Sequence, residues 1–360
     1  TLSLHDALPI SLESDFERLH AQAVARLISG NLTVVESSFS GEIAEQEITR
    51  KAWVSLAKQY HFLPVAIILN PLGLSPFNSM LSDLAREGFR HVFELKSELE
   101  IDQVEIVRQP LLSNLKNDRG PFDLIGDVHG CLDELIELLT SLGHRVHPDL
   151  TVTPRTGRKV IFLGDLVDRG PATPGVLKLA MGMVAKQSAL CVLGNHDNKL
   201  LKKLNGGDVK ITNGLAESLQ QIEKESSEIK KRIRDFLDRL VSHYVLDDGK
   251  LVVAHAGLKE EFQGRGSEQI RAFAMCGEKT GEIDEYGFPI RYNWAADYRG
   301  KAMVVYGHTP VLQPSWLNHT LNIDTGCVFG GKLTALRYPE LELVSVPAKK
   351  VYYSTLKPFS

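Results

Sequence analysis

Five apolar runs in the middle of the chain end in the same way, and this constrains the fold more than any other feature. Each run leads into glycine and into aspartate, asparagine or histidine: LIGDVHG (124–130), FLGDLVDRG (162–170), VLGNHD (192–197), VVAHAG (252–257) and VVYGHTP (304–310). A near-continuous apolar run is typical of a strand buried in a sheet. Ligands of α/β sheets bind at the carboxyl ends of such strands. The pattern therefore predicts an α/β (α+β) fold whose strand ends share one site.

The polar residues after these runs supply oxygen and nitrogen donors and no thiolate. A single histidine after a strand is usually a structural residue, and a single Gly-Asp is usually a turn. Five such endings in succession instead favour a metal site. Imidazole and carboxylate donors suit manganese, iron, nickel or zinc, and six ligands suit two ions about 3.5 to 4 Å apart with one shared carboxylate. The candidate ligands are Asp127, His129, Asp165, Asn195, His255 and His308.

In their order, GDVHG, GDLVDRG, GNHD, HAG and GHTP (126–310) resemble the motifs of the calcineurin-like metallophosphoesterases, in the branch with phosphoprotein-phosphatase-type signatures. The resemblance implies a β-sandwich flanked by helices. It implies two divalent transition-metal ions, manganese first, with nickel, iron, zinc or cobalt as alternatives. The residues that it assigns to the first ion are Asp127, His129 and Asp165. Asp165 would bridge to the second ion, whose other ligands would be Asn195, His255 and His308.

The same resemblance implies how the phosphate is bound and cleaved. The guanidinium fork of Arg169 would bind two phosphoryl oxygens. His196 would act as general acid on the leaving oxygen, with Asp168 orienting its ring. Hydroxide generated by the metal ions would attack phosphorus without a covalent intermediate. We therefore expect a hydrolase that acts on phosphoric ester bonds.

Longer stretches narrow the expectation. RGPFDLIGDVHGC (119–131), RAFAMCGEKTGE (271–282), YGHTPV and IDTGCVFGGKLTALRYPELELVSVPA (323–348) resemble the phosphatase domain of bacterial polynucleotide kinase-phosphatase. That likeness implies RNA repair: hydrolysis of 2′- or 3′-phosphates and of 2′,3′-cyclic phosphates at RNA ends, with Asp324 in the substrate site. Two alternatives share the chemistry, a phosphoserine/phosphothreonine protein phosphatase and a dinucleoside tetraphosphatase. An alternative of another class is a non-catalytic scaffold, which the complete ligand set disfavours.

The remaining patterns predict the domain organisation. Residues 1–11 are expected to be an artefactual or disordered start. Residues 12–109 alternate helical patterns (13–30, 48–62, 79–89) with strand patterns (32–39, 63–69, 91–95) and resemble a truncated P-loop-kinase-like α/β region. Because no G-x-x-x-x-G-K-[ST] occurs, kinase activity is not expected. The phosphoesterase domain is predicted at 110–350, with a linker over 111–123, an amphipathic surface helix over 215–241 and a tail at 351–360.

Charge and hydropathy limit the partners. The net charge of −4 disfavours a long phosphate-backbone footprint and leaves RNA ends or phosphorylated nucleotides as substrates, with any kinase or ligase as separate proteins. The longest apolar run, FLPVAIIL (62–69), is too short to span a membrane, so a cytoplasmic protein is expected. The four cysteines form no C-x-x-C pair and are interpreted as small packed residues. Tyr292, Trp294 and Tyr298 are interpreted as packing residues, with base stacking as the alternative.

Overall fold

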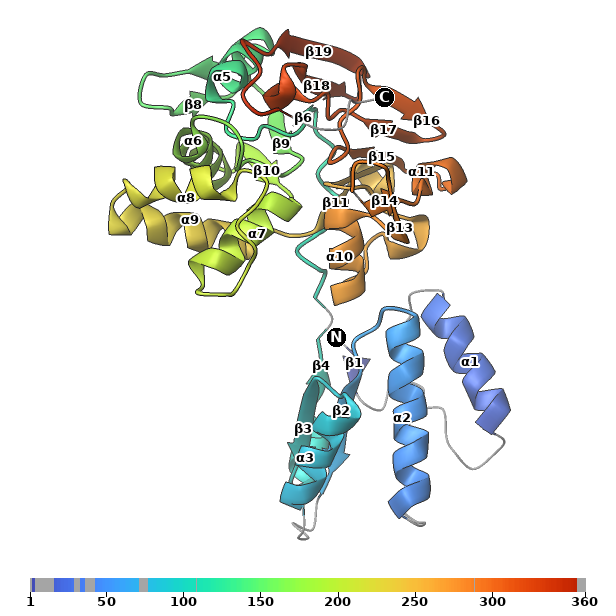
Figure 1. The fold of residues 1–360 in the computed structure, drawn as a ribbon. Coiled ribbons are helices and arrows are strands. Elements are labelled where there is room, and N and C mark those ends of the chain that lie inside the picture. The colour runs from blue at the N-terminus through green and yellow to red at the C-terminus, as the bar shows by residue number, and fades with distance from the viewer. Residues whose placement is uncertain are drawn as a thin grey trace. The chain divides into compact units, whose positions relative to one another are not determined.

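The chain divides into two compact units in this computed structural model, which describes residues 2–3, 16–28, 33–35, 43–70, 77–107, 109–287 and 289–354. One unit comprises residues 1–110 with 265–267, and the other comprises residues 111–264 with 268–360. Figure 1 colours both along the chain. The predicted start at 1–11 and most of the predicted strand at 32–39 lie outside the described residues.

The first unit is a small α/β arrangement. Two parallel strands, β2 (Val65–Leu69) and β3 (His91–Leu95), pair in register, and β1 (Leu2–Ser3) pairs with β4 (Glu105–Ile106). Its helices are α1 (Phe16–Ile28), α2 (Ile43–Gln59), α3 (Phe77–Glu87) and α4 (Glu98–Gln103). Leu19, Ala23, Leu27 and Leu56 form its buried cluster, which joins one face of α1 to α2. The predicted helices and the last two predicted strands are therefore present, with α2 beginning five residues earlier than expected.

The second unit contains two sheets. The order in the first sheet is β10 (Ala189–Cys191), β9 (Lys159–Phe162), β6 (Phe122–Ile125), β18 (Lys332–Tyr338) and β19 (Glu342–Pro347). The order in the second is β16 (Ser315–Leu317), β17 (Thr320–Asn322), β15 (Met303–Tyr306), β12 (Leu251–Ala254), β11 (His243–Leu246) and β5 (Asn114–Leu115). The strands β6, β9 and β10 are parallel, as are β12, β15 and β17. Their carboxyl ends therefore meet at common sheet edges.

The two sheets pack face to face as a sandwich, with one buried cluster between them. Successive side chains of a strand point to opposite faces. Leu124 of β6 and Ile161 of β9 belong to one buried cluster together with Val253 of β12 and Val305 of β15, so this cluster lies between the sheets. The neighbouring Ile125 belongs to a second cluster on the outer face of the first sheet. The predicted mixed α/β architecture, a sandwich flanked by helices, is confirmed.

Helices cover both outer faces of the sandwich. The layer on the first sheet consists of α5 (Leu132–Ser141), α6 (Thr173–Ala185), α7 (Asn195–Leu204), α8 (Leu215–Glu223) and α9 (Ser227–Arg239) (Figure 1). The second sheet is covered by α10 (Glu268–Cys276) and α11 (Trp294–Asp297). The shorter elements are β7 (Arg145–Val146), β8 (Val152–Thr153), β13 (Lys279–Ile283), β14 (Pro289–Arg291) and 3₁₀ turns at Asp247–Gly249, Glu260–Phe262 and Cys327–Phe329. No helix among the described residues has the length and apolarity to cross a membrane.

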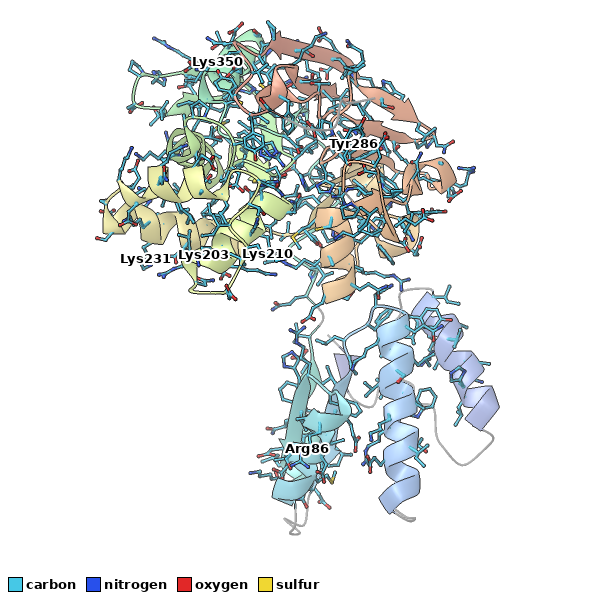
Figure 2. All side chains as sticks on the ribbon, viewed as in Figure 1. Arg86, Lys203, Lys210, Lys231, Tyr286 and Lys350 are labelled. Atoms are coloured by element: carbon cyan, nitrogen blue, oxygen red, sulfur yellow. The ribbon has the colours of Figure 1, made fainter. Side chains whose placement is uncertain are left out.

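Two sequence predictions need correction. The segment 111–123, predicted as a linker, contains β5, which pairs with β11, and the beginning of β6. A two-residue strand suffices there because β5 lies at the edge of its sheet. The single helix predicted over 215–241 is two helices, because the Ser226 hydroxyl accepts a hydrogen bond from Ile229 N at 3.2 Å and starts α9 anew. Both helices bury apolar residues, while the exposed Lys231 of α9 lies on the outer side of the helical layer (Figure 2).

Candidate binuclear metal site

The predicted site residues follow the carboxyl ends of strands in both sheets. Asp127 and His129 follow β6, while Asp165, Asp168 and Arg169 follow β9. The first two residues of α7, after β10, are Asn195 and His196, whereas His255 follows β12 and His308 follows β15. The sandwich brings these loops together, so residues from five segments share one site.

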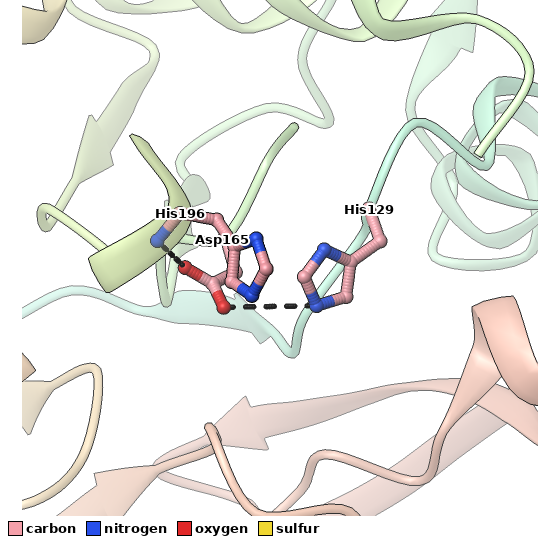
Figure 3. Close-up of side chains that lie close together, drawn as sticks. All are labelled: His129, Asp165 and His196. Atoms are coloured by element: carbon pink, nitrogen blue, oxygen red, sulfur yellow. Dashed lines mark hydrogen bonds and ion pairs between the residues drawn. The ribbon is translucent and has the colours of Figure 1, made fainter. Parts of the chain in front are cut away.

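Two groups of donor atoms share Asp165. Single donor atoms of His129, Asp165 and His196 lie within 4.8 Å of one another, as do those of Asp165, His255 and His308. Asp165 Oδ2 lies 3.6 Å from His129 Nε2 and 3.3 Å from His255 Nε2. Figure 3 shows the first group: one carboxylate oxygen of Asp165 faces the His129 ring, and the other accepts from His196 N. One carboxylate oxygen thus faces an imidazole of each group, as a bridging ligand must.

Asp127 and Asn195 adjoin the second group. The Asp127 carboxylate accepts a hydrogen bond from His308 N, with Oδ2 at 3.1 Å, and its Oδ1 lies 4.0 Å from His255 Nδ1. The Asn195 side-chain oxygen lies 3.0 Å from His255 Nε2. The His196 ring lies beside His129, while Asp127 contacts His308 and His255.

The loops that carry these side chains adopt backbone conformations that few sequences allow. Positive φ angles occur at His129 (45°), Asp165 (46°), Asp168 (73°), Arg169 (69°) and His308 (73°). Such angles are uncommon for residues other than glycine, and they concentrate at functional sites. The strained loops are therefore part of what aims the side chains into one site.

Two glycines allow the loops to approach each other. A Cβ at Gly194 would lie 2.2 Å from Asp165 N and from Asp165 Oδ1. A Cβ at Gly307 would lie 2.1 Å from Asp127 Oδ1. These are the glycines of the GNHD and GHTP motifs, so the motifs require glycine because the neighbouring loop carries a carboxylate.

Backbone and carboxylate partners orient the imidazole rings. His129 Nδ1 lies 2.7 Å from Val167 O, and His255 Nδ1 lies 2.9 Å from Leu163 O. Because a carbonyl oxygen only accepts, each Nδ1 donates and each Nε2 faces the site. His196 Nδ1 donates in the same way to Asp168 Oδ2 at 2.7 Å. Asp168 therefore orients the His196 ring, the role that the motif resemblance implied.

Arg169 joins two of these rings. Its Nη1 lies 2.6 Å from His129 Nε2, and its Nη2 lies 2.9 Å from His196 Nε2. The guanidinium carbon lies 5.0 Å from the ring centroid of Phe329 and 6.0 Å from that of Tyr353, as in cation–π contacts. Phe329 and Tyr353 thus hold the guanidinium group next to the Nε2 atoms of His129 and His196.

The charges of the site depend on one another. Burial raises the pKa of Asp127 well above its ordinary value, and Asp324 raises it further. Burial alone would also raise the pKa of Asp165, but His255 and the other histidines outweigh it and hold that pKa well below its ordinary value. Burial lowers the pKa of His255, but Asp165 and Asp127 together raise it to about 10. Burial and Arg169 lower the pKa of His129, so that ring is neutral and suited to metal ligation.

The residues present fit a pair of divalent cations. His308 Nδ1 lies 2.9 Å from His255 Nε2, and His308 Nε2 is buried with no hydrogen-bond partner among the described residues. Buried polar atoms of this kind call for a partner such as a bound ion. The donors are imidazole nitrogen and carboxylate or amide oxygen, which suit divalent transition metals.

Asp324 lies in the same neighbourhood. It is buried, and its Oδ1 accepts a hydrogen bond from Gly326 N at 3.0 Å. A Cβ on Gly307 would meet Asp127 and Asp324 together, which places the two residues side by side. Burial raises the pKa of Asp324 to about 6. The carboxyl group therefore borders the cluster from the β17 side.

Three residues of the site escaped the sequence analysis. Asp197 is buried at the start of α7 and accepts hydrogen bonds from Leu166 N and Gly194 N, both at 3.0 Å, so it ties the GNHD loop to the GDLVDRG loop. Lys199 donates to Thr212 O at 3.0 Å and interacts electrostatically with Asp168 and Arg169. Asp197 could have been found as the last letter of GNHD. Lys199 carries no motif signal.

Arg291 is the third. It lies on the exposed strand β14, outside every motif, and interacts electrostatically with Asp165 and His308. No spacing rule marks a lone arginine in a hairpin. The nearby aromatic residues differ in burial. Trp294 and Tyr298 are buried, which confirms their packing role, whereas Tyr292 is 43% exposed and is not a core residue.

Comparison with known proteins places this geometry in a family. A sequence profile of the family described as calcineurin-like phosphoesterase matches residues 120–344. The asymmetrical bis(5′-nucleosyl)-tetraphosphatase PrpE of Anoxybacillus flavithermus is 44% identical over 243 residues, which cover 66% of this chain and 99% of that protein. The enzyme of the same name from Bacillus subtilis is 43% identical, over 64% of this chain and 96% of that protein.

These relatives carry a different name from the polynucleotide kinase-phosphatases that the motifs also resemble. The narrower resemblance is therefore not supported, and a kinase remnant at 12–109 is not shown. The broader resemblance is confirmed: the chain belongs to the calcineurin-like phosphoesterase family and is a hydrolase of phosphoester bonds.

Proposed function

We propose that the protein hydrolyses dinucleoside tetraphosphates asymmetrically, to a nucleoside triphosphate and a nucleoside monophosphate. The observation that carries the proposal is 44% identity to an enzyme of that name across 99% of its length. This reading replaces RNA-end hydrolysis as the main proposal. It agrees with the net charge of −4, because a compact polyphosphate needs only local cations.

The chain's own residues suit this substrate. As the motif resemblance implies, we infer that His129, Asp165 and Asp127 hold one divalent ion, with the Asp127 carboxylate also accepting from His308 N, and that Asn195, His255, His308 and the shared Asp165 hold the other. When bound, such ions supply an activated water and neutralise phosphoryl charge. The identity of the metal, with manganese as the first candidate, belongs to the proposal as well.

Arg169 would bind the phosphoryl group that is attacked. Its two Nη groups lie on one edge of the site, 2.6 and 2.9 Å from imidazole nitrogens, and Phe329 and Tyr353 hold the fork in place. A planar fork binds two oxygens of one phosphoryl group. Arg169 lies beside His129 and His196, whereas Arg291 interacts with His308 and Asp165. A tetraphosphate bridge offers each arginine a different phosphate.

His196 would transfer a proton to the leaving oxygen. Its Nδ1 donates to Asp168, so the other nitrogen, Nε2, is the atom that faces the site. The leaving group of a tetraphosphate is a phosphate oxygen, which is a far weaker base than a ribose alkoxide. A general acid assists a poor leaving group more than a good one. Proton transfer from His196 should therefore matter less for the tetraphosphate than for the RNA-end substrates.

The test is a matched substrate panel with the purified chain and Mn²⁺. It contains diadenosine tetraphosphate, 2′,3′-cyclic AMP, 3′-AMP and a phosphothreonine peptide, with products separated by chromatography. We expect the highest kcat/KM for diadenosine tetraphosphate, with ATP and AMP formed in equal amounts. Two molecules of ADP would contradict asymmetric cleavage. Preference for the cyclic or 3′-phosphate would return the proposal to RNA ends, and preference for the peptide would make the protein a phosphoprotein phosphatase.

A further inference from the structure

A second group of buried donor atoms lies apart from the imidazole and carboxylate cluster. One donor atom each of Cys131, Glu134 and Cys327 lies within 4.8 Å of the other two. The three residues are 0%, 0% and 1% exposed. The proposed hydrolysis uses none of these side chains, and the sequence analysis interpreted the cysteines only as packed residues.

Glu134 supplies an independent sign of a missing ligand. Its Oε1 accepts two hydrogen bonds, from Lys349 N at 2.9 Å and from the Tyr352 hydroxyl at 2.8 Å. Its Oε2 is buried and has no hydrogen-bond partner among the described residues. An unpaired buried carboxylate oxygen is strongly destabilising, and a bound cation removes that cost.

The donor set selects the kind of cation. Two thiolate sulfurs and a carboxylate oxygen favour a thiophilic divalent ion such as Zn²⁺, whereas the other site offers nitrogen and oxygen only. Tetrahedral coordination with Zn–S bonds of about 2.3 Å places neighbouring donors about 3.8 Å apart. Small side-chain rotations of Cys131 and Cys327 would bring donors within 4.8 Å to that spacing.

We propose that Cys131, Glu134 and Cys327 form a third metal site, which binds a thiophilic divalent cation of the Zn²⁺ class. Cys131 lies two residues after His129, and Cys327 lies three residues after Asp324. The ion therefore joins the loop after β6 to the loop after β17. It stabilises these loops of the proposed catalytic site without contacting substrate.

Glu134 extends the same site to the C-terminal segment. Tyr352, which donates to Glu134, precedes Tyr353, whose ring lies against Arg169. Both Tyr352 N and Tyr353 N donate to Val328 O at 3.0 Å, next to Cys327. The bound cation would thus hold in place the segment that packs against the phosphate-binding arginine.

The test uses the full chain, freed of metal by chelation and titrated with Co²⁺. Thiolate ligands give Co²⁺ an intense near-ultraviolet charge-transfer absorption, which nitrogen and oxygen ligands do not give. We expect about one equivalent of Co²⁺ per chain to produce this band, beyond the two bound at the nitrogen and oxygen site, and Zn²⁺ to displace it. A wild-type protein that binds two equivalents with no thiolate band would overturn the proposal.

Variants test which residues give rise to the thiolate–Co²⁺ absorption band. The double change Cys131→Ser with Cys327→Ser should abolish it. Cys191→Ser, which changes a buried cysteine of β10 outside the cluster, should leave it intact. Glu134→Gln keeps the shape of the side chain and should weaken Co²⁺ binding at this site by about tenfold or more. A band that survives the double change, or that disappears in Cys191→Ser alone, contradicts the assignment.

A disulfide is the competing outcome. Glutathione disulfide would oxidise the two thiols to one disulfide and be reduced to two glutathione molecules. If the thiol count of the metal-free wild type falls by two under this treatment, and no thiolate–Co²⁺ band forms before it, the pair is a redox pair and the metal proposal fails. Because the readout is a spectrum, it stands whether or not dinucleoside tetraphosphates prove to be the substrate.

Discussion

The two halves of the binuclear site share Asp165 but differ in what faces their imidazoles. In the half with His129 and His196, both Nε2 atoms face the Arg169 guanidinium, at 2.6 and 2.9 Å. In the half with His255 and His308, the rings face each other at 2.9 Å, and the Asp127 carboxylate accepts from His308 N. One half therefore contains the guanidinium of Arg169, which can bind an anion. The other half is lined by imidazole, amide and carboxylate groups.

This difference predicts a separate role for each half of the site. The first combines proposed metal ligands with a guanidinium fork and with the His196–Asp168 pair, so phosphate binding and proton transfer belong there. Among the described residues no such fork contacts the imidazoles of the second, and Arg291 of the exposed strand β14 interacts electrostatically with His308. We therefore expect changes in the first half to affect kcat for every phosphoester, and changes at Arg291 to affect the longer substrate selectively.

The largest effect is expected from Asp165→Ala, because Asp165 is the residue that both halves use. Both ions would lose a ligand, and His196 N would lose its acceptor at 2.9 Å. The loss of kcat/KM should exceed the about 10²- to 10⁴-fold that removal of a general acid causes. Metal content by mass spectrometry should fall in parallel, while circular dichroism stays native. A variant with bound metal and normal turnover would show that Asp165 does not join the halves.

Much of this site could be predicted because its ligands follow strands directly. Asp127 and His129 lie within four residues of the end of β6, and His255 and His308 follow β12 and β15 within two residues. The positions of parallel strand ends are set by the sheet, so residues just after them converge whatever the loop does. The fold class followed from the same apolar runs.

The parts that could not be predicted depend on contacts between segments far apart in sequence. The contact of Asp127 with His308, whose strand β15 belongs to the other sheet, depends on how the two sheets pack, which no local pattern encodes. The edge strand at Asn114–Leu115 is only two residues long, too short for any periodicity to show, and it is defined by its pairing with β11. Arg291 lies in the hairpin of β13 and β14, and its electrostatic interaction with Asp165 is a property of the folded chain alone.

Replacing Arg169 tests whether the first half binds the phosphoryl group. Arg169→Ala removes the fork from His129 and His196, and kcat/KM should fall by about 10²- to 10³-fold, as when one preorganised donor is removed from a transition-state site. Arg169→Lys is the matched control, since it keeps the charge but not the paired geometry, and it should recover only part of the loss. Full recovery by lysine would mean that charge alone matters there.

His196→Ala should have an effect that depends on the leaving group. With diadenosine tetraphosphate, whose leaving phosphate is weakly basic, we expect kcat to fall by about tenfold, below the usual range for loss of a general acid. With 3′-AMP, whose leaving group is a ribose alkoxide, the loss should be many times larger. Asp168→Asn, which leaves the ring but weakens its anchor at 2.7 Å, should follow the same trend with smaller losses. Equal losses on both substrates would remove His196 from the proton transfer.

Arg291→Ala should give the smallest effect and the most selective one. Arg291 is exposed, and an exposed charge contributes only ~1 kcal/mol, or about fivefold in affinity. That loss should raise KM for diadenosine tetraphosphate and leave KM for a phosphomonoester such as 3′-AMP unchanged, because only the longer substrate extends beyond the phosphate bound by Arg169. The effect should also shrink at high ionic strength, since solvent-exposed charges are screened. Lys259→Ala serves as the control for loss of a surface cation, because Lys259 pairs with Glu278 at 2.7 Å and its ammonium lies over the Phe273 ring. If Arg291→Ala raised KM equally for both substrates, both arginines would bind the same phosphate, and the division of labour between the two halves would be wrong.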